Sequence, residues 1–573
     1  MLHFIDFEVF SHDWLCVIQN PITKTETVII NNKQQLEDYY NQFKNEIFVG
    51  FNIRHYDQFI FKAILCDLDP KKLNDFIIIE NGQGWNYSSL FKSINLNIFD
   101  IMPNPPIGLK TLEGFMGSNI KESDIPFDYK YKLTRDELAE TVEYCRHDVE
   151  ETIKVFVKKK EEFDSHLALI KAFDLPLNYL AKTKAQLSAL ILEASKQPHD
   201  DEFDYVIPNT AQIKKYTEVP QWYLNEENKD YTKNLEIDIA GVPHVFGWGG
   251  IHGAIPQYHG TGYFINVDVA SYYPSLMIEY NYGSRNMKNP DKYAEIYHAR
   301  LKYKAEHNPI QGPLKIVLNG TYGAMKDKFN NLYDPRQSNN VCVGGQVLLL
   351  DLIERLEETV DIIQSNTDGI LVKLRAKNDA EANREYAKVD DICYEWEQRS
   401  RMKLEFDEFV EVWQKDVNNY VIIAADGSYK SKGAYVKKLS ALDNDLPIVN
   451  KALIDYMIKG IPVEQTINES RKLIDFQKIV KLSKLYDYAM LGNRKLTDKT
   501  FRVYASNSFG TNTLFKVKNG KNPEKFANTP INCFIFNASL ENKGLPQILD
   551  KQWYIDLAKE RLKQFGVCED GSI

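Results

Sequence analysis

Short apolar runs alternate with stretches of helical periodicity over the first 160 residues of the chain. The runs have the length and composition of strands, whereas the longer stretches repeat their apolar positions with a helical period. Helices are expected near Asp57–Leu68 and from Thr134 to Lys158, the second with room for one break. The expected strands are Leu2–Phe7, Ile47–Phe51, Ile77–Glu80 and Leu96–Ile101. Alternation of this kind predicts an α/β unit.

The pattern changes after residue 160. Residues 161–250 mix helical with irregular sequence, and residues 282–325 are helical and basic. Residues 341–375 predict a helix and then a strand–turn–strand around Asn366–Gly369. The remaining expected strands are Tyr263–Asp268, Leu404–Trp413 and Tyr420–Ala424. The whole chain is therefore expected to be a multidomain protein with α/β and α+β parts.

Composition indicates a large folded protein. The 573 residues correspond to roughly four compact units. Hydrophobic residues make up 43% of the chain, enough for a substantial core. The formal net charge is −10, which excludes a histone-like protein that holds nucleic acid by bulk charge. It leaves room for a nucleic-acid enzyme with local basic surfaces and acidic metal sites.

Targeting and redox signals are sparse. No apolar stretch reaches the roughly 18 residues that a membrane helix needs, and no basic segment precedes an apolar run at the N-terminus. The seven cysteines are scattered, and no Cys-x-x-Cys pair occurs. We therefore expect no membrane association, no disulfide framework and no zinc ribbon, and a location in a reducing cytoplasm.

Acidic residues in the N-terminal unit form the first candidate site. Asp6 and Glu8 are two apart on a strand, so both side chains leave the same face. Asp57 follows the second expected strand, and Tyr144 and Asp148 are i and i+4 on a helix. Each acid alone could simply cap a helix or close a loop. Together, four acids and a phenol can hold two divalent cations about 4 Å apart, the arrangement that cleaves phosphodiesters.

Two further acids lie far apart in the sequence. Asp268 ends an apolar strand, and Asp368 lies in the tight turn Asn366-Thr-Asp-Gly369. A strand end and a hairpin turn both present a carboxylate at a rigid edge, although the turn could also be a plain one. Between them, residues 281–325 hold seven Lys/Arg and three acids, a local charge of +4. One helix face there carries Lys315, Asn319 and Tyr322 at i, i+4 and i+7, suited to a triphosphate and a flat base.

The first set of acids resembles the proofreading 3′–5′ exonuclease of the Asp-Glu-Asp-Asp type with a tyrosine. The resemblance implies that the four acids bind metal ions and that Tyr144 orients the attacking water. It also implies that Asn52 and Tyr56, from the second motif, contact DNA. Lys121 is expected to be solvated, and His147 is at the wrong spacing for the histidine variant of this nuclease. The matching acids are Asp6, Glu8, Asp57 and Asp148.

The later motifs resemble those of family B DNA polymerases. They are Asp268-x-x-Ser-x-Tyr-Pro-Ser, Lys315-x-x-x-Asn319-x-x-Tyr322-Gly and Asn366-Thr-Asp368-Gly, in the order of that family. The resemblance implies that Asp268, Asp368 and Val269 belong to a site for two Mg²⁺ ions, with Mn²⁺ as a substitute, and that the nuclease site also takes two. It implies that Tyr273 packs under the sugar and excludes a 2′-OH. The residues implied to bind the dNTP are Arg300, Lys304 and Lys315 at its phosphates and Asn319 and Tyr322 at the base pair.

Several positions depart from the family pattern. Asn366 replaces the usual first Asp of the third motif, Gly369 its Ser, and Gly320 the Ser of the second motif. The usual Lys-x-Tyr motif appears as Asn418-Asn-Tyr420, where nearby lysines such as Lys432 could supply the charge to DNA. Gly249 and Gly250 lie where phage members of the family carry a Gly-Gly pair that contacts the template, and an ordinary turn would explain them equally well. Glu405 and Asp407 are further acids that could approach the metals.

The resemblance implies an RNase H-like exonuclease domain followed by a right-hand polymerase. Its expected partners are primer–template DNA, single-stranded DNA and dNTPs, with replication accessory proteins and a monomeric state. Only 47 residues separate Asp268 from Lys315, which leaves no room for the long insertion of protein-primed phage polymerases. A nucleic-acid primer is therefore expected, in a compact phage or mobile-element enzyme acting in a bacterial cytoplasm. The expected domains are exonuclease 1–175, connecting region 176–255, palm 256–280 and 326–415, fingers 281–325 and thumb 416–573.

Two alternatives remain open from the sequence. The first is a nuclease with an inactive polymerase site, suggested by Asn366 and Gly320. The second is a non-catalytic replication or single-strand-binding factor whose aromatic side chains stack on bases. That factor would have no need of acids at both sites.

Overall fold

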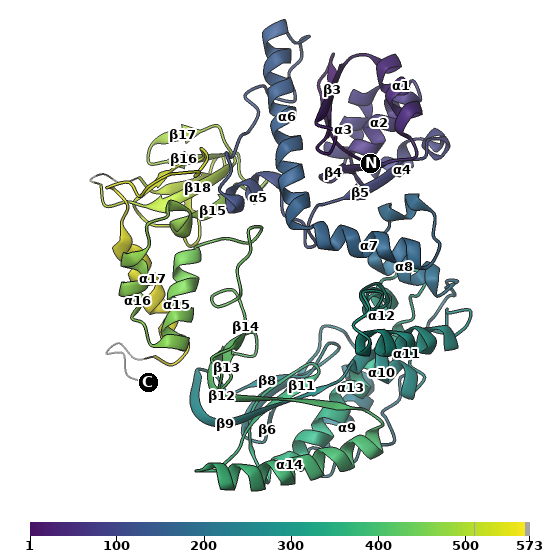
Figure 1. The fold of residues 1–573 in the computed structure, drawn as a ribbon, viewed down its shortest axis with the longest axis vertical. Helices are drawn as coiled ribbons and strands as arrows, with labels where there is room; N and C mark the ends of the chain where they lie inside the picture. Colours follow the sequence, from purple (N-terminus) through teal and green to yellow (C-terminus); the bar gives the residue numbers. More distant parts are fainter. Residues whose placement is uncertain (509, 511, 568–573) are drawn as a thin grey trace. The chain divides into compact units, whose positions relative to one another are not determined.

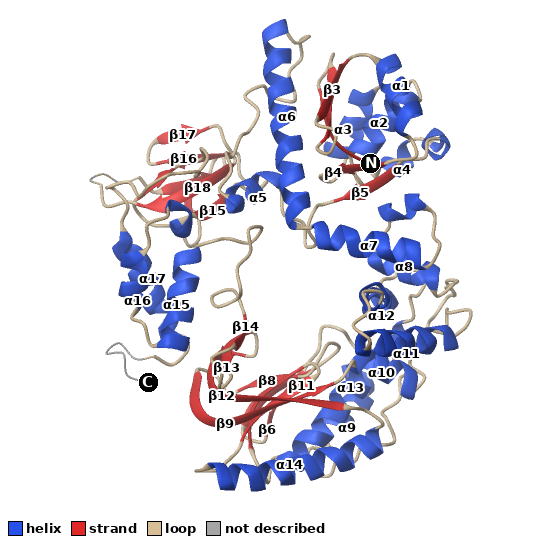
Figure 2. Cartoon of the chain, in the orientation of Figure 1, coloured by secondary structure: helices blue, strands red, loops and turns tan. Residues whose placement is uncertain are grey.

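A computed structural model describes residues 1–508, 510 and 512–567. The chain is a mixed α/β protein that divides into two compact units, and its path crosses from one to the other several times (Figures 1 and 2). The first unit comprises Met1–Thr183, Leu439–Ile448 and Glu469–Tyr554. The second comprises Lys184–Lys438, Val449–Asn468 and the chain from Ile555 onward. No helix in the part of the chain that the structure describes is long and apolar enough to cross a membrane.

A five-stranded sheet forms the centre of the first unit, in the order β3-β2-β1-β4-β5. The first three strands are an antiparallel meander, and β4 and β5 run parallel to β1. Helix α6 packs against β1 and β2. The strands are β1 (Leu2–Val9), β2 (Trp14–Asn20), β3 (Thr25–Ile30), β4 (Ile47–Gly50) and β5 (Asn97–Asp100). The helices of this part are α1 (Lys33–Phe43), α2 (Asp57–Leu65), α3 (Pro70–Ile78), α4 (Gly84–Tyr87), α5 (Leu109–Met116), α6 (Arg135–Lys158) and α7 (Lys160–Ala172).

Most of the elements expected in this region are confirmed. The strands near residues 2, 47 and 96 are present, and α6 is continuous from its capping box at Thr134. The strand expected at Ile77–Glu80 is wrong, because Ile77 and Ile78 end helix α3. Asp69 caps that helix by accepting from the N–H groups of Lys71 and Lys72, and Pro70 occupies its first turn. These start signals outweigh the β propensity of the isoleucines.

The first unit also contains a C-terminal β module, residues 478–540, built from two small sheets. Their strand orders are β15-β18-β21 and β17-β16-β19-β20. The residues shared by their core include Val480, Leu514 and Cys533. The strands are β15 (Lys478–Lys481), β16 (Tyr488–Leu491), β17 (Arg494–Leu496), β18 (Thr500–Ala505), β19 (Leu514–Val517), β20 (Glu524–Lys525) and β21 (Cys533–Ile535).

A nine-stranded antiparallel sheet dominates the second unit, in the order β14-β13-β12-β9-β11-β10-β8-β7-β6. Helix α13 (Pro335–Leu356) packs against β11, and α14 (Asp379–Ser400) packs against α13 (Figure 1). The strands are β6 (Leu235–Ile239), β7 (Val242–Phe246), β8 (His252–Ala254), β9 (Tyr258–Val269), β10 (Asp361–Asn366), β11 (Gly369–Lys373), β12 (Leu404–Asp416), β13 (Asn419–Ile423) and β14 (Tyr429–Lys432). The strands and the hairpin expected at residues 263–268, 366–369, 404–413 and 420–424 are confirmed.

Helices α11 and α12 form the basic pair expected over residues 282–325, and α12 also packs against α8. Helix α15 (Pro447–Lys459) begins next to the boundary between the two units, and α17 (Lys551–Lys563) spans another. The other helices from residue 184 onward are α8 (Lys184–Ile191), α9 (Glu218–Leu224), α10 (Tyr272–Glu279), α11 (Asp291–Ala305), α12 (Gln311–Lys326), α13 (Pro335–Leu356), α14 (Asp379–Ser400) and α16 (Val463–Glu469).

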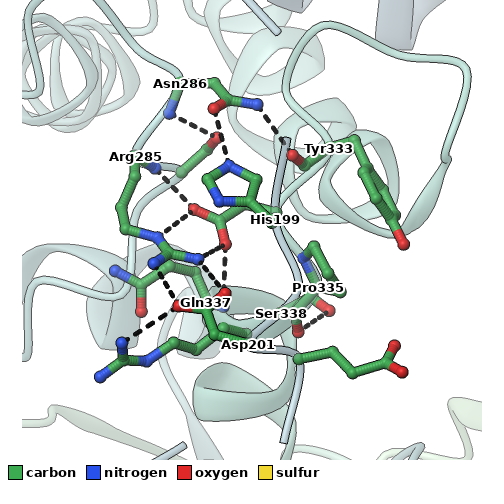
Figure 3. A network of polar contacts seen from close by, with 12 residues as sticks. His199, Asp201, Arg285, Asn286, Tyr333, Pro335, Gln337 and Ser338 are labelled. Atoms are coloured by element: carbon green, nitrogen blue, oxygen red, sulfur yellow. Dashed lines mark hydrogen bonds and ion pairs between the residues drawn. The ribbon is translucent and has the colours of Figure 1, made fainter. Parts of the chain in front are cut away.

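A polar network fixes the start of α13 (Figure 3). Asp334 is fully buried and caps the helix, and Arg285 joins it to Asp201. The Arg285 guanidinium donates to Asp201 at 2.6 and 2.9 Å and to Asp334 at 2.8 and 3.0 Å. Next to this pair, His199 and Asn286 hydrogen-bond at 2.9 Å. Two segments distant in sequence are thereby held against the helix that supports the large sheet.

The described cysteines are all free, as expected from their spacing. Cys568 lies outside the described residues.

Candidate active sites

Four carboxylates come together in the first unit. Asp6 and Glu8 leave the same face of β1, as their spacing predicts. Asp57 begins α2, and Asp148 lies on α6, which packs against β1. Glu8, Asp57 and Asp148 are only 5%, 3% and 8% exposed, whereas Asp6 is half-buried, so three of the four acids are nearly closed to bulk water.

The electrostatics of this cluster fit a bound cation. Burial, together with repulsion from Asp57 and Asp148, raises the pKa of Asp6 well above its usual range, and burial and Asp6 do the same for Glu8. Burial raises the pKa of Asp57 to about 8. One carboxylate oxygen of Asp57, Oδ1, is buried without a hydrogen-bond partner. Divalent cations that prefer oxygen ligands would satisfy this atom and relieve the repulsion.

Tyr144 and Lys110 complete this first site. Tyr144 lies one turn before Asp148 on α6, as predicted, and is 9% exposed. Lys110 on α5 forms an ion pair with Asp148 and a second with Glu113 at 3.1 Å. Its Nζ lies 4.6 Å from the centroid of the Tyr144 ring. Burial lowers the pKa of Lys110, whereas Asp148 and Glu113 raise it. Their combined effect leaves the pKa of Lys110 above its usual value.

Sequence reasoning missed Lys110 and Glu113. A lone lysine and glutamate on a short helix carry no spacing signal, and Asp148 follows Lys110 by 38 residues. The other lysine considered, Lys121, approaches Glu113 only through its backbone N–H. His147 Nε2 lies 3.7 Å from Glu113 Oε1, so His147 borders the cluster without making a short contact to it.

Asn52 and Tyr56, the two residues of the first unit that are expected to contact DNA, have different environments. Tyr56 lies beside the acid cluster, and its hydroxyl donates to Asn74 Oδ1 at 2.7 Å. Asn52 has a φ of +63° in the turn after β4, and its backbone N–H donates to Asp100 at 3.0 Å. That turn sets the path of the chain into Asp57.

In the second unit, Asp268 and Asp368 face a common cavity of about 330 Å³. Asp268 lies near the end of β9, and Asp368 in the two-residue turn between β10 and β11. Val269 is 3% exposed, and its N–H donates to the Asp368 carbonyl at 2.7 Å, which fixes the turn against β9. The cavity is lined by Asn266, Asp268, Gln364, Asn366, Thr367, Asp368, Gly369, Leu371, Tyr420, Ile422, Lys430 and Lys432.

The charges in this cavity are nearly balanced. Burial and Asp368 raise the pKa of Asp268 to about 6, while Lys430 and a 2.6 Å hydrogen bond from Asn266 act against the rise. Burial raises the pKa of Asp368, and Lys432 acts against that rise. Two carboxylates, one on β9 and one in the turn between β10 and β11, line one cavity with the side chains of Asn266 and Asn366, and carboxylate oxygens are ligands that suit Mg²⁺. Lys432 and Tyr420, both expected to contact DNA, line the same cavity.

Glu405 and Asp407 both belong to the neighbouring strand β12. Glu405 pairs with Asp268 across the strands, so the two side chains share a face of the sheet. Asp407 is paired with Lys430 at 2.6 Å and also helps to raise the pKa of Asp268.

A second cavity, of about 260 Å³, adjoins Asp368. It is lined by Tyr273, Asn319, Tyr322 and Asp368 together with residues of α10. The rings of Tyr273 and Tyr322 lie 4.3 Å apart, and the buried Tyr322 hydroxyl has no hydrogen-bond partner. The three motifs expected to hold a nucleotide thus meet at one place.

The three side chains predicted to bind phosphates differ in how far they are exposed. Arg300 reaches the first motif, donating to Ser271 Oγ at 3.3 Å, and its buried Nε has no partner. Lys304 and Lys315 are exposed, and neither lines the two cavities.

The glycine pair approaches the turn that carries Asp368. A Cβ on Gly250 would lie 2.8 Å from Thr367 Oγ1, and the Thr367 N–H donates to the Ile251 carbonyl at 2.9 Å. From the other side, Gln346 on α13 donates to the carbonyl of Gly249 at 3.2 Å. Gly250 therefore allows a close approach of two backbones, and this is the physical reason for a glycine here.

Gly320 is explained by packing rather than by chemistry. A Cβ at this position would lie 2.7 Å from Ser188 Oγ, at the contact between α12 and α8. The absence of the family's serine therefore does not bear on the cavity next to Asp368.

Comparison with known proteins finds a similarity among solved structures. No family model matches the chain, and no curated protein sequence matches it. Among solved structures, the chain is similar to the family B DNA polymerase from the hyperthermophilic archaeon Pyrobaculum calidifontis. The similarity covers 98% of this chain and 77% of that chain, with 15% sequence identity and a TM-score of 0.43.

Proposed function

We propose that this protein is a template-directed DNA polymerase that also removes nucleotides from a 3′ end. The observation that carries the proposal is the presence of two separate carboxylate sites, each within its own compact unit. A binding protein needs neither. Buried carboxylates that repel one another reduce the stability of a fold unless a bound cation compensates their charge. Such a cluster therefore indicates a cation site or a catalytic site.

The polymerase site would lie at Asp268 and Asp368, which would hold two Mg²⁺ ions. When bound, such ions lower the pKa of the attacking hydroxyl and neutralise the triphosphate. Tyr273 would support the deoxyribose, and Asn319 and Tyr322 the new base pair, in the cavity that they share with Asp368. Arg300, Lys304 and Lys315 would contact the phosphates, and Lys432, Tyr420, Gly249 and Gly250 the primer–template.

The nuclease site would lie at Asp6, Glu8, Asp57 and Asp148, which would hold the second pair of ions. Tyr144 would orient the attacking water by its hydroxyl. Lys110 would keep Asp148 charged and hold the Tyr144 ring in place, because it contacts both. Tyr56 and Asn52 would guide the single strand. In this assignment the exonuclease, residues 1–175, lies in the first unit, the palm and fingers lie in the second, and the proposed thumb, residues 416–573, has parts in both.

A gel assay on an end-labelled primer–template with Mg²⁺ tests both activities at once. Addition of dNTPs should lengthen the primer to the end of the template, and omission of dNTPs should shorten it. If neither product appears in the presence of Mg²⁺ or Mn²⁺, the proposal fails.

One observation favours a second candidate, a nuclease with an inactive polymerase site. Asn366 takes the place of an acid beside Asp368, and two lysines line the same cavity, so its negative field is weak. Shortening of the primer without any extension, over a range of Mg²⁺ and dNTP concentrations, would establish this alternative.

A further inference from the structure

Helix α5, which brings Lys110 and Glu113 to the nuclease site, is held at its C-terminal end by an arginine from the C-terminal β module. Arg502 lies on β18 and is fully buried. Its guanidinium donates to carbonyl groups on two segments of the first unit. The acceptors are Ser118 at 2.6 Å, Gly114 at 3.3 Å and Glu113 at 3.4 Å on one side, and Ala538 at 2.8 Å and Phe536 at 3.3 Å on the other.

The physical reason for an arginine here lies in the end of α5. The carbonyls of Glu113 and Gly114 in the last turn of α5 already accept from the N–H groups of Ser118 and Gly117 at 3.0 and 3.1 Å, but each carbonyl can accept a second hydrogen bond. The negative end of the helix dipole also attracts a cation. A guanidinium has five donors in a fixed plane and can satisfy several such carbonyls together. Burial lowers the pKa of Arg502 to about 10, so the side chain stays charged at neutral pH. Removal of the guanidinium would leave the carbonyls of Gly114 and Ser118 without this donor.

Further contacts fasten the same segment to the same module. A Cβ on Gly114 would lie 2.9 Å from Ile479, so α5 packs directly on β15. The Ile120 N–H donates to the Asn537 carbonyl at 2.8 Å. Glu122 Oε1 accepts from the N–H groups of Lys499 and Thr500 at 2.9 and 2.8 Å.

We infer that Arg502 is a positioning residue of the nuclease site and that the C-terminal β module is a working part of the nuclease. Arg502 holds α5 in the place where Lys110 and Glu113 reach Asp148 and Tyr144. Without it, α5 is free to shift, and Lys110 loses its pairing with Asp148. The inference rests on the proposed nuclease activity and adds to it a residue that touches neither the acids nor the substrate.

The link between Arg502 and Lys110 is testable without any activity. Lys110 is mostly buried and doubly paired, with a side chain 15% exposed, so an amine-acylating reagent should modify it slowly in the wild-type chain. Labelling quantified by mass spectrometry should become faster in Arg502→Met and return toward the wild-type rate in Arg502→Lys. The exposed Lys304 is the internal control and should label at one rate in all three proteins. Unchanged labelling of Lys110 in Arg502→Met would overturn the inference.

Kinetics on labelled single-stranded DNA then test the consequence. We expect Arg502→Met to lower kcat about 10- to 100-fold with little change in KM. A misplaced α5 would disturb the groups that react but not the binding of the DNA strand. The double variant Arg502→Met/Lys110→Met should have the same kcat as Lys110→Met. Both substitutions remove the same contact, the pairing of Lys110 with Asp148, so their effects should not multiply. Multiplying effects, or a wild-type kcat in Arg502→Met, would contradict the inference.

Two further variants make the test robust. Glu122→Ala removes hydrogen bonds that fasten the same segment outside the core, so this variant replaces Arg502→Met if Arg502→Met does not fold. Its kcat should fall several-fold. A wild-type kcat would contradict the inference. Arg375→Met is the matched control. Arg375 also donates to carbonyls directly after the end of a helix, those of Glu357 and Glu358 behind α13, but in the second unit, so its loss should leave digestion unchanged. If the wild type itself digests nothing, the proposed nuclease activity fails, while the labelling still decides the role of Arg502.

Discussion

The carboxylate of Asp268 lies directly against the Cα of Gly369, its partner across strands β9 and β11. A Cβ at position 369 would overlap Asp268 Oδ1, far inside van der Waals contact. The absence of a side chain at Gly369 therefore leaves the space that the Asp268 carboxylate occupies. A 2.6 Å hydrogen bond from Asn266 holds the carboxylate in this position.

Gly369→Ala should accordingly displace Asp268 and lower the rate of primer extension about tenfold or more. Digestion of single-stranded DNA should be unaffected, because the acids of the proposed nuclease site lie in the other unit. Gly312→Ala is the matched control, since nothing lies within 4 Å of a Cβ there. Steady-state extension rates of the two variants provide the check, and a Gly369→Ala enzyme as fast as Gly312→Ala would refute the role of this contact.

Asn366→Asp should lower the Mg²⁺ concentration needed for extension several-fold, because it adds a negative charge to a cavity shared with Asp368. Titration of extension rate against Mg²⁺ measures this directly. Asn366→Ala serves as the comparison and should not show the gain. A higher Mg²⁺ requirement in Asn366→Asp would mean that the amide itself is needed.

Gly320→Ala should lower the free energy of unfolding by about 1–3 kcal/mol, because its new methyl group would crowd Ser188 between α12 and α8. The unfolding transition of the second unit in chemical denaturant would measure this loss of free energy of unfolding. Ser188→Ala in the same chain should recover part of it by removing the atom that is crowded. Full stability of Gly320→Ala would show that the two helices separate easily.

Some of these features follow from the sequence and others do not. The two-residue spacing of Asp6 and Glu8 and the i, i+4 spacing of Tyr144 and Asp148 fix a shared face, because strand and helix geometry leave no alternative. The hairpin around Asp368 was equally predictable from its Asn-Thr-Asp-Gly turn. These are local relationships, and the structure bears them out.

Relationships between distant segments were not predictable. Arg502 meets α5 across more than 380 residues, and nothing in either segment marks the partner. Gly320 and Gly369 looked like losses of a family serine, and only the packing explains them. The strand expected at Ile77–Glu80 is wrong for a local reason, because the cap at Asp69 and the proline at position 70 start a helix that continues through Ile77 and Ile78.

Acid should weaken the network around Asp201. Hydrogen bonds from Arg285 and Arg336 hold the pKa of Asp201 well below its usual value of about 3.9. A carboxyl whose pKa is lower in the folded state contributes stability above its unfolded pKa and loses it as the pH falls. Asp201→Asn should therefore cost about 1–2 kcal/mol at pH 7, and the difference from wild type should shrink below about pH 4. Urea denaturation at pH 7, 5 and 3 tests this, and a difference that grows toward pH 3 would contradict it.

The most direct test of two separate sites is a single gel assay on three proteins: wild type, Asp368→Ala and the pair Asp6→Ala/Glu8→Ala. Loss of a proposed metal ligand should cost about 100-fold or more, since even partners of metal ligands cost 10- to 100-fold. Asp368→Ala should lose extension and keep digestion, and the double variant should lose digestion and keep extension. Extension at the wild-type rate by Asp368→Ala would contradict the assignment of the polymerase site, and digestion at the wild-type rate by Asp6→Ala/Glu8→Ala would contradict that of the nuclease site.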